Sequence, residues 1–326
     1  MSAIDRLKVG CLPAMAAVIV STLDVHFVHA QGYPARPVHI ITAESGSGGD
    51  IVGRLVVPGL SAGLGQAVVV ENRGGPPVNS AGAVAKAAPD GHTLLLHGAT
   101  VWLLPFMQDA GYDVLRDLAP VTQLVSAPNV LVVNPALAVS DVKSLIALAK
   151  ARPGELNYAS GPSGSTSHLT TELFKSMAAV NLVRVPFKGT APALNDVIGG
   201  HLELMFSVAV SVTPHVKSGR LRALAIASAQ PSAVAPGLPT IASFGLPGFE
   251  SVITLGILAP ARTLAAVLSR INREVALAAN VAEVKDKIFA TGAEVVAGTP
   301  EQFAATMKSE MVRMGKVIKD AGIRPD

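Results

Sequence analysis

The run Ser160–His168 combines glycine, hydroxyl and imidazole groups in a pattern that suits anion binding. It follows a strand-like run at Leu156–Ala159 and leads into a segment whose apolar residues, at 169, 173, 174 and 177, share one helical face. A glycine- and serine-rich loop that opens a helix gathers unpaired backbone N–H groups at the positive end of the helix dipole. No lysine follows a glycine pair, so this run is not a phosphate-binding P-loop. We therefore predict that this segment, which we call the middle loop, binds a carboxylate.

Two further loops have the same strand-to-helix setting. In the first loop, Ser45–Asp50, Asp50 can cap the helix that follows, and two spaced glycines resemble the start of a dinucleotide-binding fingerprint. Ile51 stands where that fingerprint needs its third glycine, so a plain strand-to-helix turn remains the alternative. In the third loop, Phe187–Thr190, a glycine allows close backbone approach. Lys188 could supply charge there, although a lysine on a solvated edge remains the alternative.

Ser165 and His168 raise the question of a serine hydrolase. A nucleophile elbow needs the pattern Gly-x-Ser-x-Gly, which this loop lacks. His168 and Glu172 face the same side of the expected helix, but two ligands are too few for a metal site, and no HExxH motif is present. We expect the His168 ring to bond the loop backbone at the start of the helix. No catalytic residue, metal or cofactor is expected, and a Ser-dependent hydrolase stays a minor alternative.

The composition suits a large globular α/β protein. The 326 residues are 50% hydrophobic, 15% charged and 4% aromatic, a profile that fits helices packed on buried parallel strands and argues against disorder. The net charge of +3 is small, and the sequence has no basic run, zinc-type cluster or aromatic stacking motif. We therefore expect no nucleic-acid partner.

Residues 1–30 have the pattern of a secretory signal peptide. Arg6 and Lys8 precede a mostly apolar run from Leu12 to Leu23, and small side chains allow cleavage near Ala30. A membrane anchor is the alternative, but an apolar run of about twelve residues is shorter than the roughly twenty that span a bilayer. The single cysteine, Cys11, lies in this segment, so cysteine and disulfide chemistry are not expected in the mature chain.

Strand and helix patterns alternate along the chain, which predicts parallel sheets covered by helices on both faces. Short apolar runs predict strands at Val38–Thr42, Ala67–Val70, Thr93–Leu96, Val130–Val133, Leu182–Val185, Leu202–Phe206 and Leu221–Ala227. Helical periodicity predicts helices at Asp50–Gly63, Val142–Ala151, Ser165–Ala178, Ala191–Ile198, Ala265–Ala278 and Glu301–Ala321. The last helix has a clear start signal, since Thr299 offers an N-cap and Gln302 completes a capping box. Its apolar residues recur at three- and four-residue steps and are expected in the core: Phe303, Met307, Met311 and Met314.

Several longer runs occur in the same order in one known family and cover nearly everything after Gly32. They are Tyr33-Pro34-x-Arg36-Pro37, Gly48-Gly49-Asp50-Ile51-Val52-x-Arg54, Leu64-Gly65-Gln66-x-Val68-Val69-Val70-Glu71-Asn72-Arg73, Ala83-Val84-Ala85-Lys86-Ala87-Ala88-Pro89-Asp90-Gly91, Leu156-Asn157-Tyr158-Ala159-Ser160-Gly161, Gly164-Ser165-x-Ser167-His168-Leu169, Gly189-x-Ala191-Pro192-Ala193-Leu194 and Gly245-Leu246-Pro247-Gly248-Phe249-Glu250. On these runs the chain resembles the Bug-type (TctC-like) periplasmic solute-binding proteins of bacterial tripartite tricarboxylate transporters.

That resemblance implies an α/β fold of two lobes, a type II-like periplasmic binding protein, with a ligand cleft between the lobes and two crossing strands as the hinge. The crossings would lie near Ala127–Val130 and Phe249–Ile253. Residues 31–127 with 250–326 would form lobe 1, and residues 128–249 would form lobe 2. The resemblance also implies a periplasmic protein without enzyme activity, which captures a small organic acid and delivers it to integral membrane transporter subunits. We expect a monomer.

The resemblance further implies which residues bind the ligand. Backbone amides, side-chain hydroxyls and waters from the first and middle loops would hold a carboxylate, and the third loop would complete the wall of lobe 2. The expected ligand-binding residues are Ser45, Gly46, Ser47, Gly48, Gly49, Asp50, Gly161, Ser163, Gly164, Ser165, Thr166, His168, Phe187, Lys188, Gly189, Thr190 and Ser207.

Two departures from the family pattern leave the ligand open. Glu44 would repel an anionic ligand if it faced the cleft, so either it points outward, or the ligand carries an amine or lacks a carboxylate at that end. Ser207 stands where an acidic residue often follows Met205-Phe206, which removes a negative charge from the cleft wall. An extracytoplasmic sensor that engages a signalling partner also stays open, because sensing and transport need the same cleft.

Overall fold

The structure is a computed structural model that describes residues 32–74 and 77–324. The expected signal peptide with its cleavage site near Ala30 therefore lies outside the described residues, as does Cys11. From Tyr33 onward the described chain forms one compact unit. Within that part, no helix combines the length and apolar character needed to cross a bilayer.

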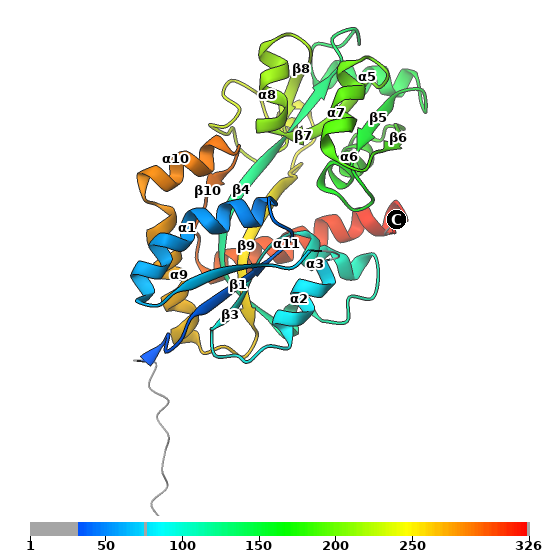
Figure 1. Cartoon of the computed structure of the whole chain (residues 1–326). Helices are drawn as coiled ribbons and strands as arrows, with labels where there is room; N and C mark the ends of the chain where they lie inside the picture. Colours follow the sequence, from blue (N-terminus) through cyan, green and yellow to red (C-terminus); the bar gives the residue numbers. More distant parts are fainter. Residues whose placement is uncertain (1–31, 75–76, 325–326) are drawn as a thin grey trace, which may run out of the picture. The chain divides into compact units, whose positions relative to one another are not determined.

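The elements alternate between strands and helices along most of the chain (Figure 1). In chain order they are β1 (Val38–Thr42), α1 (Gly48–Leu64), β2 (Val68–Asn72), α2 (Pro77–Ala85), β3 (Thr93–Gly98), α3 (Thr100–Leu103), η2 (Leu104–Phe106), α4 (Val114–Asp117), β4 (Leu118–Val133), α5 (Val142–Ala151), β5 (Asn157–Ser160), α6 (Thr166–Ala178), β6 (Val183–Pro186), α7 (Thr190–Ile198), β7 (Leu204–Val208), α8 (Ala209–Lys217), β8 (Arg222–Ile226), η3 (Ile241–Phe244), β9 (Val252–Pro260), α9 (Ala265–Ala279), α10 (Ala282–Ala290), β10 (Glu294–Val295) and α11 (Pro300–Asp320).

The first sheet has the strand order β2-β1-β3-β9-β4, with β10 paired to β4. β1 runs parallel to β2 and β3, whereas β9 is antiparallel to β3 and to β4. Both faces are buried, because successive side chains of a strand point to opposite sides. Leu94 and Leu96 of β3 pack with α1 and α9, and Leu95 packs in the cluster that contains α2, α3 and α11. This sheet and its helices make lobe 1.

The second sheet continues from the other end of β4, which lies between β7 and β8, and it ends with β5 and β6. Alternate residues again pack on two faces. Val130 and Val132 contact the cluster of α7 and α8, whereas Leu131 and Val133 belong to the cluster of α5 and α6. This sheet and its helices make lobe 2.

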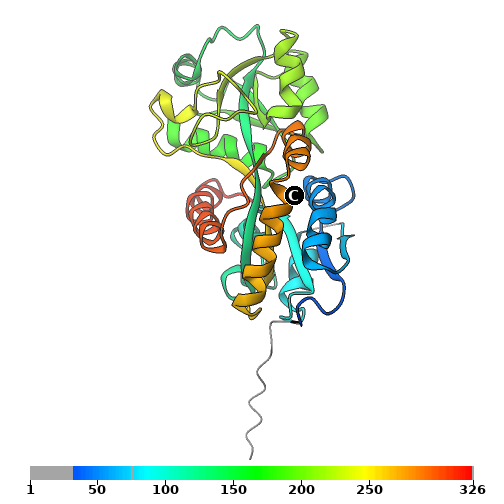
Figure 2. The same cartoon turned by 90° about the vertical axis from the view of Figure 1, so that its left-hand side faces the viewer.

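The two lobes are joined where strands pass from one sheet to the other. β4 pairs with β9 as far as Pro128 and with β7 from Asn129 onward, so it changes sheets between these residues (Figure 2). The returning chain does the same at Ser251, whose N–H donates to Ala227 O of lobe 2 just before β9 begins. Both positions fall inside the ranges that the resemblance places at the hinge. We propose that lobe 1 comprises residues 31–127 with 250–326 and that lobe 2 comprises residues 128–249.

The expectation of parallel sheets is met where β1 pairs with β2 and β3 and where β5 pairs with β6 and β7, but β4 and β9 are antiparallel to their neighbours. The apolar runs did not predict β9, although the resemblance places a crossing strand near its start, and they predicted β4 only at Val130–Val133 although it starts at Leu118. The longer strand was not predicted because it contains two prolines, and proline is disfavoured inside a central strand. Pro120 lies where the pairing register of β4 with β9 shifts, and Pro128 lies where β4 exchanges partners.

The helix predictions agree better with the structure. The helix expected at Val142–Ala151 is α5 with the same bounds, and α11 has the predicted capping box between Thr299 and Gln302. Phe303, Met307 and Met314 are buried, as expected for core residues. The short helices α2, α3, α4, α8 and α10 were not expected.

Candidate functional site

Two adjoining cavities lie between the lobes. The first, of about 220 Å³, is lined by the ends of β1 and β3, the start of α1, the start of β9, the face of α11 and part of the middle loop. The second, of about 250 Å³, is lined by the middle loop, the start of α7, the end of β7 and Asn129 of β4. Thr166 and Ile253 line both cavities. Residues from both lobes and from the crossing strands therefore enclose one divided cleft.

The structure brings ten of the expected ligand-binding residues to the cavity walls. Those in the first cavity are Ser47, Gly48, Gly49, Gly164 and Thr166. Those in the second are Gly161, Ser165, Thr166, Gly189, Thr190 and Ser207.

Seven expected residues lie outside both walls: Ser45, Gly46, Asp50, Ser163, His168, Phe187 and Lys188. Ser45, Gly46 and Lys188 are exposed to solvent, and Phe187 packs on the apolar cluster of lobe 2. Asp50, Ser163 and His168 are engaged in holding the loops.

The helix α6 begins without a side-chain cap on its backbone. Its N-cap residue Ser165 makes no capping hydrogen bond, and the Ser165 hydroxyl instead lies 3.3 Å from the Ser167 hydroxyl. The backbone N–H groups of Thr166 and Ser167 have no partner in the described part of the chain. A 13-residue helix therefore directs unsatisfied donors and its positive dipole end toward the cleft.

Ser207 supplies a further unused hydrogen-bonding group in the second cavity. Its residue is only 3% exposed, and its Oγ has no partner among the described residues. A buried hydroxyl without a partner costs free energy, so such groups normally find one. Ser207 and the start of α6 line the same cavity.

Arg184 of β6 holds the middle loop, and sequence reasoning missed it. Its Nε donates to Ser160 Oγ at 2.8 Å, its Nη1 to Ser163 Oγ at 3.0 Å, and its Nη2 to Gly161 O at 2.9 Å. The signal in the sequence was a cation inside a short apolar strand. Because the guanidinium occupies oxygen acceptors, it does not compete for the backbone N–H donors of Thr166 and Ser167.

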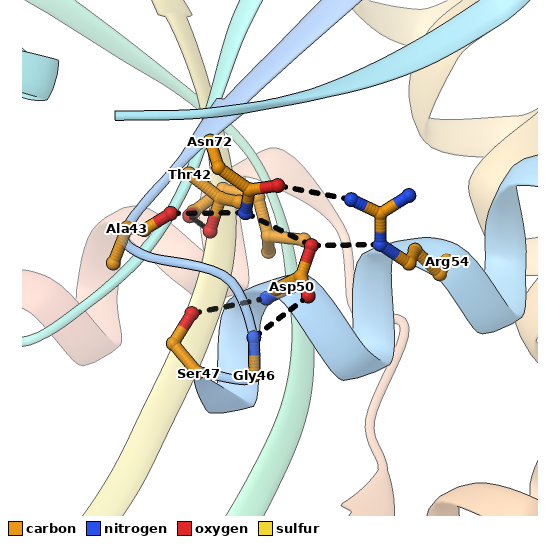
Figure 3. A network of polar contacts seen from close by, with 8 residues as sticks. Thr42, Ala43, Gly46, Ser47, Asp50, Arg54 and Asn72 are labelled. Atoms are coloured by element: carbon orange, nitrogen blue, oxygen red, sulfur yellow. Dashed lines mark hydrogen bonds and ion pairs between the residues drawn. The ribbon is translucent and has the colours of Figure 1, made fainter. Parts of the chain in front are cut away.

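Asp50 holds the first loop in a different way (Figure 3). Its Oδ2 accepts from Gly46 N–H at 2.9 Å, and its Oδ1 accepts from Asn72 Nδ2 at 2.9 Å and Arg54 Nε at 2.8 Å. The expectation that Asp50 caps α1 is wrong, since Ser47 is the N-cap and accepts from Asp50 N–H. The hydrogen bond from the Gly46 backbone, with those from Asn72 and Arg54, lowers the pKa of Asp50.

His168 has the role expected of it, because its Nδ1 accepts from Gly164 N–H at 3.2 Å. Gly164 has a φ of +74°, and a Cβ there would lie 2.8 Å from Met107 Sδ of lobe 1. The glycine thus allows the middle loop to approach the other lobe. Neither this contact nor that of Ser165 with Ser167 is the serine–imidazole pair of a hydrolase.

The helix α11 contributes a wall that sequence reasoning missed. Glu310 is 5% exposed and accepts from Trp102 Nε1 at 2.8 Å and from the Thr254 hydroxyl at 2.6 Å. Burial raises the pKa of Glu310, against the opposing effect of those hydrogen bonds. Arg313 pairs with Glu250 at 3.3 Å. The sequence did contain a signal for this wall, because helical spacing places the Glu310 carboxylate on the same face as the buried Phe303, Met307 and Met314.

Glu44 is exposed and does not line either cavity, which matches the outward orientation considered for it. No cluster of three potential metal ligands occurs within residues 32–74 and 77–324.

Comparisons with known proteins agree on one family. A family model described as "Tripartite tricarboxylate transporter family receptor" (TctC) matches residues 52–323. Protein BugT of Bordetella pertussis is 36% identical over 319 residues, which are 96% of this chain and 98% of BugT. The solved structure "R. palustris Rpa4515 with adipate" has a TM-score of 0.73 and 34% identity, over 90% of this chain and 100% of that chain. "MatC (Rpa3494) from Rhodopseudomonas palustris with bound malate" has a TM-score of 0.71 and 28% identity, over 88% of this chain and 100% of that chain.

Proposed function

Because this chain belongs to the tripartite tricarboxylate transporter receptor family (TctC), we propose that it captures a small organic acid in its interlobe cleft and delivers it to the membrane subunits of such a transporter. Related proteins of this family are periplasmic binding proteins, and the signal-like pattern of residues 1–30 supports the same location here. The chain acts as a non-enzymatic, monomeric carrier.

This proposal rests mainly on the second cavity. Its wall includes the start of α6, which has no side-chain cap, and Ser207, whose hydroxyl has no described hydrogen-bond partner. The N–H groups of Thr166 and Ser167 and the Ser207 hydroxyl are all hydrogen-bond donors without a described partner. A carboxylate has acceptor sites for several donors and carries the charge that a helix N-terminus favours. The second cavity therefore suits the carboxylate of the ligand.

The ligand class is supported by two relatives. The structure of Rpa4515 contains adipate and that of MatC contains malate, both of which are dicarboxylates. In this chain Glu44 is exposed and lines neither cavity, so solvent screens the repulsion that its carboxylate would exert on such anions.

Ligand binding closes the lobes if the closed form binds the ligand more tightly than the open form. A ligand that contacts α6 of lobe 2 and the start of α1 of lobe 1 stabilises the closed form over the open form. Gly164 allows the middle loop to lie close to Met107 of lobe 1, where a larger side chain would hinder the approach of the lobes. The closed form is then the species that a membrane partner distinguishes from the empty receptor.

A thermal-shift screen of small carboxylates, with their amides as controls, tests the proposal. A ligand at about 100 times its Kd stabilises the folded protein by about 2.7 kcal/mol, which raises Tm visibly. If no carboxylate in the screen raises Tm, the proposal is wrong. Deletion of the gene then separates transport from sensing, since loss of uptake supports delivery and loss of ligand-induced transcription alone supports a sensor.

Ser207→Ala gives a residue-level test. The affinity for the carboxylate should fall about tenfold, as expected for a lost hydrogen bond, while Tm without ligand should not fall, because the hydroxyl has no partner among the described residues. Ser160→Ala is the matched control, since that buried hydroxyl accepts from Arg184 and donates to Gly161 O. Its loss should lower Tm without ligand.

A further inference from the structure

Lobe 1 places three ionisable side chains in the wall of the first cavity: His97 at the end of β3, and Glu310 and Arg313 on α11. None of them belongs to the three glycine-bearing loops. Their hydrogen-bond partners decide which chemical group this part of the cavity can receive.

We infer that His97 is a specificity-determining residue, which donates a hydrogen bond from Nε2 to a second oxygen of the ligand, remote from the carboxylate at α6. This inference rests on the proposed function, because it concerns the other end of the same ligand. It narrows the ligand class to aliphatic acids that carry a further oxygen acceptor.

The neighbours of His97 fix its tautomer. Nδ1 accepts from Gly98 N–H at 2.9 Å, and the Thr100 hydroxyl lies 3.4 Å from the same nitrogen. A backbone N–H can only donate, so Nδ1 carries no proton and the neutral ring has its proton on Nε2. Nε2 has no partner among the described residues, and His97 lines the cavity.

The neutral state of the ring agrees with its surroundings. Burial lowers the pKa of His97, and this effect exceeds the opposing influence of the Gly98 hydrogen bond and of the Glu44 carboxylate. The ring therefore acts as an uncharged donor at neutral pH.

The other polar groups of this wall favour an acceptor rather than an amine on the ligand. Both oxygens of Glu310 already accept hydrogen bonds, from Trp102 and Thr254. The Nε of Arg313 is buried without a partner among the described residues. The wall thus offers donors, and a ligand oxygen would satisfy them.

The remaining lining describes what joins the two ends of the ligand. Leu103, Leu169, Val252, Leu255 and Met314 also line the first cavity. An apolar lining gains free energy from burying methylene groups. The inferred ligand is therefore an acid with a carboxylate at one end, an aliphatic chain, and an oxygen acceptor at the other end.

Two near-isosteric variants separate the two nitrogens of the ring. His97→Asn keeps an acceptor near the position of Nδ1 but lacks the Nε2 donor, whereas His97→Gln places an amide donor near the position of Nε2. Isothermal titration calorimetry of the purified protein would use dicarboxylates, ω-hydroxy acids and monocarboxylates of four, six and eight carbons. Tm without ligand reports whether each variant folds.

The native protein should bind the probes with a distal oxygen more tightly than the monocarboxylate of the same length. His97→Asn should reduce that preference about tenfold, with monocarboxylate affinity unchanged, and His97→Gln should retain it. A loss confined to dicarboxylates identifies the distal acceptor as a carboxylate, and a loss shared by the ω-hydroxy acids shows that a hydroxyl suffices.

The inference is overturned if the native protein shows no preference for a distal oxygen, or if His97→Asn weakens all probes equally or none. Those results leave the proposed function intact, because carboxylates still bind. If the native protein binds no carboxylate in the panel, the proposed function and this inference fail together.

Discussion

The first loop and the middle loop are both held by a charged side chain, but the charges are opposite. Asp50 accepts a hydrogen bond from the backbone of the first loop, at Gly46 N–H. Arg184 donates to the middle loop, at Gly161 O and two hydroxyls. Asp50 thus occupies a backbone donor that an anionic ligand could use, whereas Arg184 occupies only acceptors. Two loops with similar sequences therefore differ in their capacity to bind a carboxylate.

Arg184→Met should have the largest effect on this comparison. The variant removes three hydrogen bonds from the middle loop, and a bond to a charged group contributes about 1.5–3 kcal/mol. We expect roughly 100-fold weaker carboxylate binding, measured by isothermal titration calorimetry. Arg222→Met is the control, because Arg222 donates to Val139 O, away from both cavities. Affinity within threefold of the native value would show that the middle loop does not depend on Arg184.

Gly164→Ala should have the next largest effect, because the substitution acts on the approach of the middle loop to lobe 1. The left-handed conformation costs an alanine about 1–2 kcal/mol, and its Cβ would meet Met107 Sδ at 2.8 Å. We expect lower Tm and about tenfold weaker binding. Gly111→Ala is the matched control, with a φ of +66° and no atom within 4 Å of its Cβ. If both variants reduced affinity equally, the close approach of residue 164 to Met107 would not explain the loss of binding.

Asp50→Asn should affect stability more than carboxylate binding. The pKa of Asp50 is lowered in the folded state, so its ionised form stabilises the protein above its unfolded pKa, and this contribution is lost as pH falls through the folded pKa. The Tm difference between native protein and variant should therefore shrink between pH 6 and pH 3. A Tm difference that does not change with pH would exclude the carboxylate charge as the group that holds the first loop.

Glu44→Gln should have the smallest effect. Glu44 is exposed and outside both cavities, so removing its charge in water changes affinity for dicarboxylates less than about twofold. Titrations at low and high salt measure this directly. Clearly tighter binding at low salt would place Glu44 close to the ligand and would weaken the contrast between the two loops.

Local signals in the sequence were sufficient for the loops and for most helices. Ser165 as the residue that begins α6 and the ring of His168 on the loop backbone followed from helix-start chemistry alone. Arg184 was missed because its partners come from a neighbouring strand, which only the folded sheet brings near. Glu310 was missed because its pairing with Trp102 joins residues far apart in the chain.

The central strand β9 illustrates a second reason for failure. Gly256 interrupts its apolar pattern, and the structure explains the glycine by the ring of Phe303, which lies where a Cβ would stand. A glycine in a strand weakens the local signal and marks close approach by another group. That approach depends on α11, so no reading of residues near Gly256 could predict it.

The position of β9 between β3 and β4 has a consequence for the order of folding. The strands of lobe 2 lie close together in the chain, between residues 129 and 226, whereas β3 must wait for β9 before its free edge is paired. Contacts between distant segments form slowly, and unpaired strand edges promote association. We expect lobe 2 to fold first during synthesis, and lobe 1 to remain open to aggregation or to chaperones until residues 252–260 have emerged.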